Sequence, residues 1–328
     1  MSELTVAAWA AETRTHVITE PRGAAYAAFR AAFDERAYLR GLERRGFRWL
    51  GRSDADYPPL LRAIHDPPPG LFLRGAADPS VLARPAVAIV GARSCSSYGS
   101  AVARACGREL GAAGLVVVSG LARGVDGEAH RGALAASATT VAVLGCGIDR
   151  DYPASHRELA RQIAEAGLVV SEYAPGVEPA PWRFPARNRV IAGLTAATIV
   201  VEARSASGAL ITADLALEEG REVLAVPGEI TSELSAGTNG LLRLGATPLT
   251  RPADALEVFG LADRDPTPVP VLGEAAASVL AQVRDGATAA DELAVSTGLA
   301  APALSGALTE LELAGLVEQA EGRYRVAP

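Results

Sequence analysis

Glycine recurs beside serine or arginine at four points in the central part of the chain, a combination suited to binding anions. The four segments are GARSCSSYG (91–99), SGLARGVD (119–126), GCGIDRDYP (145–153) and ARSASGALITA (203–213). Glycine lets a backbone come close to a phosphate, and a helix that begins after such a loop offers free N–H groups. Arginine adds paired donors that match phosphate oxygens. These segments therefore predict an anion-binding site.

The elements around these segments must bring them together. Apolar runs alternate with helix-like segments from residue 86 to residue 260, a pattern typical of a parallel sheet covered on both faces. Right-handed crossovers then give an α/β, doubly wound, Rossmann-like domain, whose ligands bind at the carboxyl ends of the strands. The runs are VAIV (87–90), LVVVS (115–119), TVAVL (140–144), LVVSE (168–172), TIVVEA (198–203), EVLAVP (222–227) and the weaker ATPLT (246–250).

The loops that follow these strands supply the candidate site residues. Four arginines are expected to converge on one rim with serines between them: Arg93, Arg123, Arg187 and Arg189, with Ser96, Ser119 and Ser207. Phe184 and Trp182 lie among these arginines in the sequence. Aromatic rings beside arginines suit bases stacked next to phosphates, although Phe184 is equally suited to anchoring its loop on the core.

Several common chemistries are not indicated. Gly91 is followed by Arg93 rather than a second glycine, so the dinucleotide fingerprint is absent, and a chain whose 31 basic residues are all Arg cannot form a Walker motif. Asp126 and His130 are four residues apart without a third metal ligand, which favours a capping role for Asp126. Ser119 lacks the GxSxG context of a serine hydrolase. The three cysteines show no disulfide or zinc spacing. We expect no metal and no cofactor.

The sequence divides into four parts. Residues 1–53 are predicted to form a small N-terminal helical domain, and residues 54–260 the Rossmann-like domain, which begins with a proline-rich connector and a short strand at 71–74. Residues 261–272 form a linker. Residues 273–328 show three helical segments and a hairpin, which is a winged helix.

Charge and hydropathy limit the classes of partner and the cellular compartment that the sequence predicts. The formal net charge is −7, but residues 1–204 carry 24 Arg against 20 Asp and Glu, so an anion site is expected in this part of the chain. The N-terminus lacks the pattern of a signal peptide, and no apolar run is long enough to cross a bilayer. We expect a cytoplasmic protein.

Seven segments, in their order and spacing, resemble the DNA-processing protein A (DprA, also called Smf) family. They are VAIVGARSCSSYG, VVSGLARGVDGEAH, VAVLGCGIDRDYP, SEYAPG, FPARNRVIAGL, VVEARSASGALITADLALEEGREVLAVPG and SAGTNGLLRLGA, and the upstream DYPPLLRAIHDPPPGLFLRG also fits. The resemblance covers about residues 55–260. The N-terminal helices, which would be SAM-like, and the winged helix fit the appendages of this family.

The resemblance implies a protein that is not an enzyme. It implies binding of single-stranded DNA in the Rossmann-like pocket, a homodimer, and loading of the RecA recombinase during natural transformation. The DNA-binding residues would be Gly91, Arg93, Ser96, Gly120, Arg123, Phe184, Arg187, Asn188, Arg189, Ser207 and Gly208. Two positions depart from the family pattern: Ala92 replaces a usual Ser or Thr, and His156 replaces an Asn.

The apolar segment at 239–250 is the candidate dimer surface, with Leu241 and Leu242 at its centre. The sequence disfavours two rival functions. Residues 227–242 resemble the PGGxGTxxE signature of nucleotide phosphoribohydrolases but lack its catalytic Glu. A transcription factor that reads DNA through the winged helix is disfavoured by the acidic charge of that part, because phosphate contacts dominate DNA affinity. The winged helix is therefore predicted to contact protein.

Overall fold

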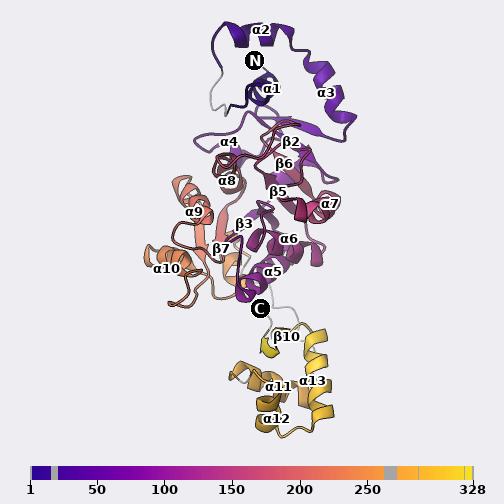
Figure 1. The fold of residues 1–328 in the computed structure, drawn as a ribbon, viewed down its shortest axis with the longest axis vertical. Helices are drawn as coiled ribbons and strands as arrows, with labels where there is room; N and C mark the ends of the chain where they lie inside the picture. Colours follow the sequence, from indigo (N-terminus) through magenta and orange to yellow (C-terminus); the bar gives the residue numbers. More distant parts are fainter. Residues whose placement is uncertain (1, 16–20, 262–271, 287, 321, 327–328) are drawn as a thin grey trace. The chain divides into compact units, whose positions relative to one another are not determined.

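The computed structural model describes residues 2–15, 21–261, 272–286, 288–320 and 322–326. Within them, nine strands form one sheet in the order β1-β2-β6-β5-β4-β3-β7-β8-β9 (Figure 1). Strands β3 to β9 are parallel to one another, whereas β2 pairs antiparallel with both β1 and β6. The bounds are β1 Arg48–Gly51, β2 Gly70–Arg74, β3 Ala86–Val90, β4 Val116–Ser119, β5 Thr140–Leu144, β6 Leu168–Ser171, β7 Ala197–Val200, β8 Glu222–Ala225 and β9 Thr247–Pro248.

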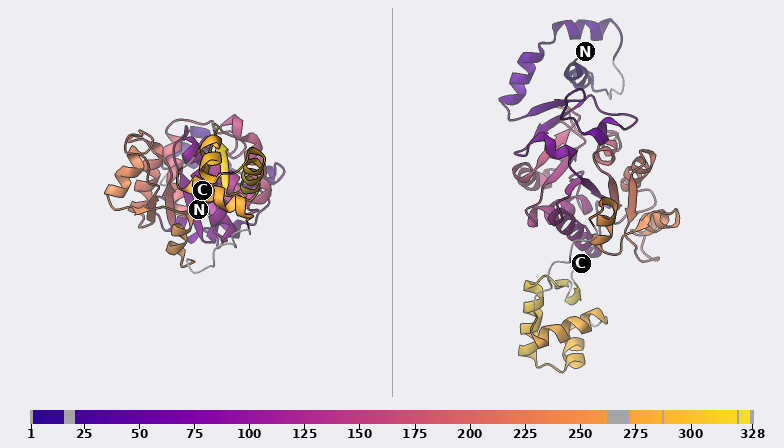
Figure 2. Two further views of the ribbon diagram at one scale, coloured as in Figure 1. Left: turned by 90° about the horizontal axis from the view of Figure 1, so that it is seen from below. Right: turned by 180° about the vertical axis from the view of Figure 1, so that it is seen from behind.

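Helices cover both faces of this sheet. Alternate strand residues point to opposite faces, so Val87 and Ile89 pack under α5 and α6, while Ala88 and Val90 pack under α8 and α9. Figures 1 and 2 show these two helix pairs on opposite sides of the strands. The bounds are α4 Pro59–Arg62, α5 Ser97–Ala112, α6 Val125–Ala135, α7 Arg157–Ala166, α8 Arg183–Leu194, α9 Gly208–Glu218 and α10 Ala236–Arg243. The doubly wound fold predicted from the sequence is confirmed.

Strand β1 was not predicted. Its four residues lie within the segment assigned to the N-terminal helices, and they pair with β2 so that Trp49 lies opposite Phe72 and Leu50 opposite Leu71. A run of four residues is too short to show the alternation that distinguishes a strand, and only its pairing with β2 reveals it.

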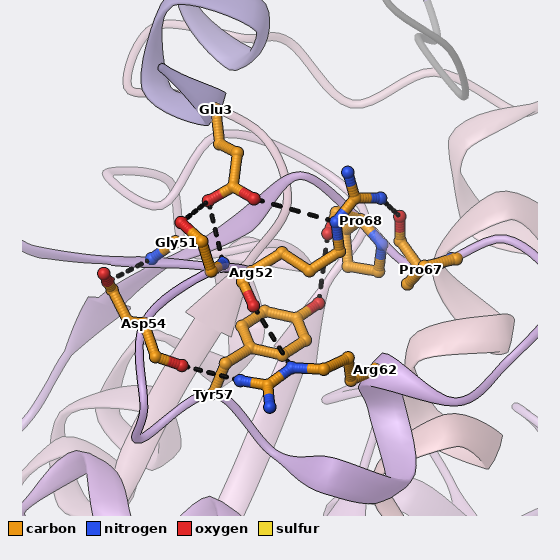
Figure 3. Close-up of polar contacts among 9 residues, drawn as sticks. Glu3, Gly51, Arg52, Asp54, Tyr57, Arg62, Pro67 and Pro68 are labelled. Carbon is orange, nitrogen blue, oxygen red and sulfur yellow. Dashed lines mark hydrogen bonds and ion pairs between the residues drawn. The ribbon is translucent and has the colours of Figure 1, made fainter. Parts of the chain in front are cut away.

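The N-terminal helices rest on the connector that precedes β2. They are α1 (Glu3–Thr13), α2 (Ala24–Ala32) and α3 (Glu35–Glu43). The carboxylate of Glu3 accepts hydrogen bonds from the backbone N–H and the hydroxyl of Ser53, each at 3.0 Å, and pairs with Arg52 at 3.7 Å. In Figure 3, Arg62 donates to the carbonyls of Arg52 and Asp54 and so holds the connector beneath Glu3. Residues 1–262 form one compact unit, and a boundary at residue 53 remains a prediction.

Residues 263–328 form a second compact unit, whose described part is a winged helix. Its helices are α11 (Glu274–Arg284), α12 (Ala290–Thr297) and α13 (Ala301–Leu313), followed by the hairpin of β10 (Val317–Ala320) and β11 (Arg323–Val326). Gly298 ends α12 with a φ of 68°, a left-handed conformation that favours glycine. Most of the predicted linker at 261–272 lies outside the described residues.

No helix in the described ranges has both the length and the apolar character needed to cross a membrane.

A buried histidine makes the stability of the sheet domain dependent on pH. The Nδ1 atom of His130 lies 2.7 Å from the hydroxyl of Thr140, and burial lowers the pKa of His130 to about 3. The unfolded chain, in which the pKa of histidine is about 6.5, therefore binds one more proton than the folded chain between these values. We expect this group to lower the free energy of unfolding by about 2 kcal/mol between pH 7 and pH 5.

Urea unfolding of the wild type and of His130→Gln at both pH values measures this effect. The variant cannot titrate at this position, so its stability should fall less on acidification. An equal fall in both proteins would contradict the assignment.

Candidate nucleic-acid interface

A cleft of about 490 Å³ opens at the carboxyl ends of the parallel strands. It lies between the loop after β3, the first turn of α9 and the first two turns of α8. A second hollow of about 190 Å³ shares five of its lining residues and extends it over the loops after β4 and β5. The lining residues of the larger cleft include Gly91, Arg93, Asp126, Tyr152, Phe184, Arg187, Asn188, Ser207 and Gly208, and those of the smaller hollow include Gly120, Arg123 and Ser155.

The open wall of the cleft carries a cation and two aromatic rings. The guanidinium of Arg93 lies over the ring of Phe184, 5.3 Å from its centroid. On the same ring, Tyr152 stacks with its centroid 5.5 Å away and an interplanar angle of 29°. Tyr152 is 45% exposed, and the guanidinium of Arg93 makes no hydrogen bond or ion pair within the described residues. The wall therefore offers both a stacking surface and a cation that has no hydrogen-bond or ion-pair partner in the described part of the chain.

The floor of the cleft is formed by Arg187, whose side chain is buried. Its guanidinium donates to the carbonyl of Gly120 at 2.7 Å and to the carbonyl of Val143. A Cβ atom at position 120 would lie 2.6 Å from this guanidinium, so any larger residue there would force the guanidinium to shift from this position. Burial raises the pKa of the neighbouring Asp126 carboxyl, and the charge of Arg187 opposes that rise. The two side chains place a fixed positive and a fixed polar group under the cleft.

The third side of the cleft is a helix N-terminus. Ser207 caps α9 by accepting a hydrogen bond from the backbone N–H of Ala209 at 3.3 Å, and Gly208 begins the helix. The amide of Asn188 donates to the carbonyl of Gly208 at 3.1 Å and ties α8 to this end of α9. The free N–H groups and the dipole of a helix N-terminus favour an anion. An unpaired nucleotide, with phosphate and base, matches this set of groups.

Comparison with known proteins identifies the family of this chain. The family model of DNA recombination-mediator protein A matches residues 48–260, and that of the DprA winged helix domain matches residues 262–323. The chain belongs to the DprA/Smf family. The putative DNA processing protein DprA of Mycobacterium tuberculosis is 41% identical over 304 residues, which cover 87% of this chain and 78% of that protein. Protein Smf of Escherichia coli is 39% identical, with coverage of 82% and 74%.

Solved structures of DprA proteins share the fold. DprA from Streptococcus pneumoniae superposes with a TM-score of 0.67 and 36% identity, covering 78% of this chain and 92% of that chain. DNA processing protein A from Helicobacter pylori, whose structure describes a single-stranded DNA binding mode, gives 0.59 and 31%, covering 65% and 95%. The family expected from the sequence is thus confirmed.

Two residues carried over from the DprA resemblance do not line the cleft. Ser96 caps α5, and its hydroxyl and backbone N–H both bind the carboxylate of Glu202. Arg189 lies on the far side of α8, where it pairs with Asp66 at 2.7 Å and Glu172 at 2.5 Å. Both therefore hold the domain together, and their part in DNA binding remains a prediction.

Three residues singled out in the sequence, His156, Leu241 and Leu242, are buried or partly buried in the structure, and one residue that lines the cleft is absent from the predicted site. His156 is buried, with its Nδ1 atom 3.0 Å from the carbonyl of Leu121. Leu241 is 6% exposed and belongs to the core, and Leu242 packs partly against that core. Tyr152 was missed, although it lies in a loop already singled out. Its signal was an aromatic residue directly after Asp151 at the end of a strand-exit loop.

Proposed function

We propose that this chain binds single-stranded DNA, without sequence preference, in the cleft between the loop after β3, α8 and α9. The observation that carries the proposal is the open wall, where Arg93, Phe184 and Tyr152 stack in series. Bases stack on aromatic side chains whatever their identity, and each such contact contributes about 1–3 kcal/mol. Arg93, Arg123 and the N-terminus of α9 would bind the phosphates. The Helicobacter pylori relative, described as binding single-stranded DNA, supports the proposal.

The difference in affinity between single-stranded and duplex DNA distinguishes this function from non-specific electrostatic attraction to DNA. A duplex keeps its bases stacked inside, so it cannot offer them to Phe184 and Tyr152. Fluorescence anisotropy with single-stranded and duplex oligomers of one sequence tests this difference. About three phosphate contacts in the cleft predict a slope of log affinity against log salt near −2 for a single strand short enough to be held by the cleft alone. Equal affinity for both forms, or an affinity independent of salt, would overturn the proposal.

The second part of the proposal is transfer of the bound strand to a recombinase of the RecA type. The name of the matching family, a recombination mediator, supports it. The assay follows RecA assembly on single-stranded DNA with and without this chain, and a shortened lag is expected. An unchanged or longer lag would oppose this part without affecting the DNA-binding part.

We expect a homodimer that places two clefts on one strand and so increases avidity. Leu241 cannot serve because it is buried, but Leu244 at the end of α10 is 87% exposed and Ile230 is 96% exposed. Leu244→Glu should shift the dimer toward monomer, as measured by light scattering at micromolar concentration. Leu313→Glu, at a leucine of the winged helix that is 84% exposed, is the matched control and should stay dimeric. A wild-type monomer would contradict the expectation.

Deleting residues 265–328 should leave affinity for single-stranded DNA within about threefold of the wild type, less than the 1.4 kcal/mol of a tenfold change. The described part of the winged helix carries seven Asp and Glu against three Arg, and α13 shows Glu310 and Glu312 where a DNA-reading helix would carry basic residues. The same anisotropy assay measures the deletion. Complete loss of binding would show that the winged helix takes part in DNA binding.

A further inference from the structure

A row of three arginines runs along α3, far from the cleft in the sequence. Arg36, Arg40 and Arg44 are spaced four residues apart and therefore share one side of the helix. All three are exposed, while Leu42 on the opposite side is buried in the core. Within the described residues, none of the three guanidinium groups makes an ion pair or a hydrogen bond. Even with Glu43 nearby, this face keeps a net positive charge.

Other arginines close to this row in the sequence make structural contacts, whereas the three arginines of the row make none with the described residues. Residues 21–52 hold eight Arg and three Asp or Glu, in a chain whose net charge is −7. Two of the other arginines make contacts that stabilise the fold. Arg48 donates to the carbonyls of Gly75 and Ala77, and Arg52 pairs with Glu3. The fold of α3 rests instead on Leu42 and on the ring of Tyr38 against Phe33. The row on α3 is thus not required for packing and offers its charge to a partner.

The turn that follows α3 contacts the loop that completes the cleft. Arg45, next to the last arginine of the row, pairs with Asp149 at 2.9 Å. Asp149 precedes Tyr152 by three residues in the loop after β5, so the chain between them spans at most about 11 Å. A DNA strand whose base stacks on Tyr152 and whose backbone continues toward β5 therefore passes close to the end of α3.

We propose that Arg36, Arg40 and Arg44 bind the phosphate backbone of the DNA strand beyond the cleft, on the side of Tyr152. The proposal rests on the proposed function. The row extends about 12 Å along the helix, which suits on the order of two or three phosphates. With guanidinium groups but no exposed aromatic ring in the row, this contact recognises the backbone alone and is independent of sequence.

Oligomers of two lengths distinguish binding to the arginine row from binding in the cleft. The protein is the full chain with Arg36→Ser, Arg40→Ser and Arg44→Ser combined, and the probes are thymidine oligomers of six and thirty nucleotides. We expect unchanged affinity for the six-nucleotide oligomer, which the cleft alone can hold. For the thirty-nucleotide oligomer we expect about tenfold weaker binding at low salt and a salt slope smaller by about 2, because three phosphate contacts are lost.

A matched control removes the same charge elsewhere. Arg243→Ser, Arg284→Ser and Arg323→Ser combined should bind both oligomers as the wild type does. Full affinity of the α3 variant for the long oligomer would overturn the inference, as would an equal loss on both oligomers or a loss matched by the control. If the wild type itself fails to bind the short oligomer, the proposed function fails instead, so the two failures are distinguishable.

Discussion

Replacing Arg93 with alanine should weaken binding of single-stranded DNA by about ten- to one-hundredfold without changing the stability of the domain. A charge-assisted hydrogen bond contributes about 1.5–3 kcal/mol, and 1.4 kcal/mol corresponds to a factor of ten. The stability should not change because Arg93 is exposed and its contact in the protein is with the ring of Phe184. Anisotropy titration measures the affinity, and urea unfolding measures the stability.

Two further variants sharpen this result. Arg93→Lys keeps the charge but loses the planar group that lies on Phe184, so its affinity should fall between those of the wild type and the alanine variant. Arg243→Ala removes an exposed arginine from α10, outside the cleft lining, and should bind as the wild type does. If the folded Arg93→Ala protein binds with wild-type affinity, the DNA strand does not contact the open wall of the cleft.

Replacing Arg189 with alanine should unfold the domain more readily, with a loss of about 3–5 kcal/mol in the free energy of unfolding. The side chain of Arg189 is 9% exposed and lies between Glu172 and Asp66, whose side chains are 8% and 17% exposed. Removing the guanidinium leaves these carboxylates buried without their counter-charge. Urea unfolding at pH 7 measures the loss, and the double variant Arg189→Ala with Glu172→Gln should recover part of it.

The matched control for this variant is Arg161→Ala. Arg161 also pairs with two carboxylates, those of Glu158 and Glu165, but on the exposed surface of α7. Solvent screens such pairs, so little change in stability is expected. Comparable losses at the two positions would contradict the account of Arg189 as a buried bridge between α8 and the connector.

The sheet and the position of the cleft could be predicted because the signals are local. Strands buried on both faces read as uninterrupted apolar runs, and the loops at their carboxyl ends must meet at one edge. The direction of individual side chains could not be predicted with the same success. Arg187 and Arg189 are two residues apart on α8, and positions two apart on a helix do not share a face. The cleft therefore takes Arg187, while Arg189 faces the connector.

The other differences also arise from tertiary contacts. Ser96 was expected at the DNA because it follows a strand-exit glycine, but Glu202, more than one hundred residues later in the chain, engages both its N–H and its hydroxyl. Tyr152 joins the site only because the loop after β5 lies beside the start of α8, where Phe184 stacks on it. Neither the partner of Ser96 nor the ring contact has a sequence spacing that would reveal it.

Photo-cross-linking locates the bound strand most directly. A single-stranded oligomer that carries 5-iododeoxyuridine is irradiated in complex with the full chain, and the modified peptides are identified by mass spectrometry. We expect cross-links on Tyr152 or Phe184, with a yield that falls in Arg93→Ala. Cross-links confined to residues 273–326, with none on the peptides that line the cleft, would contradict it.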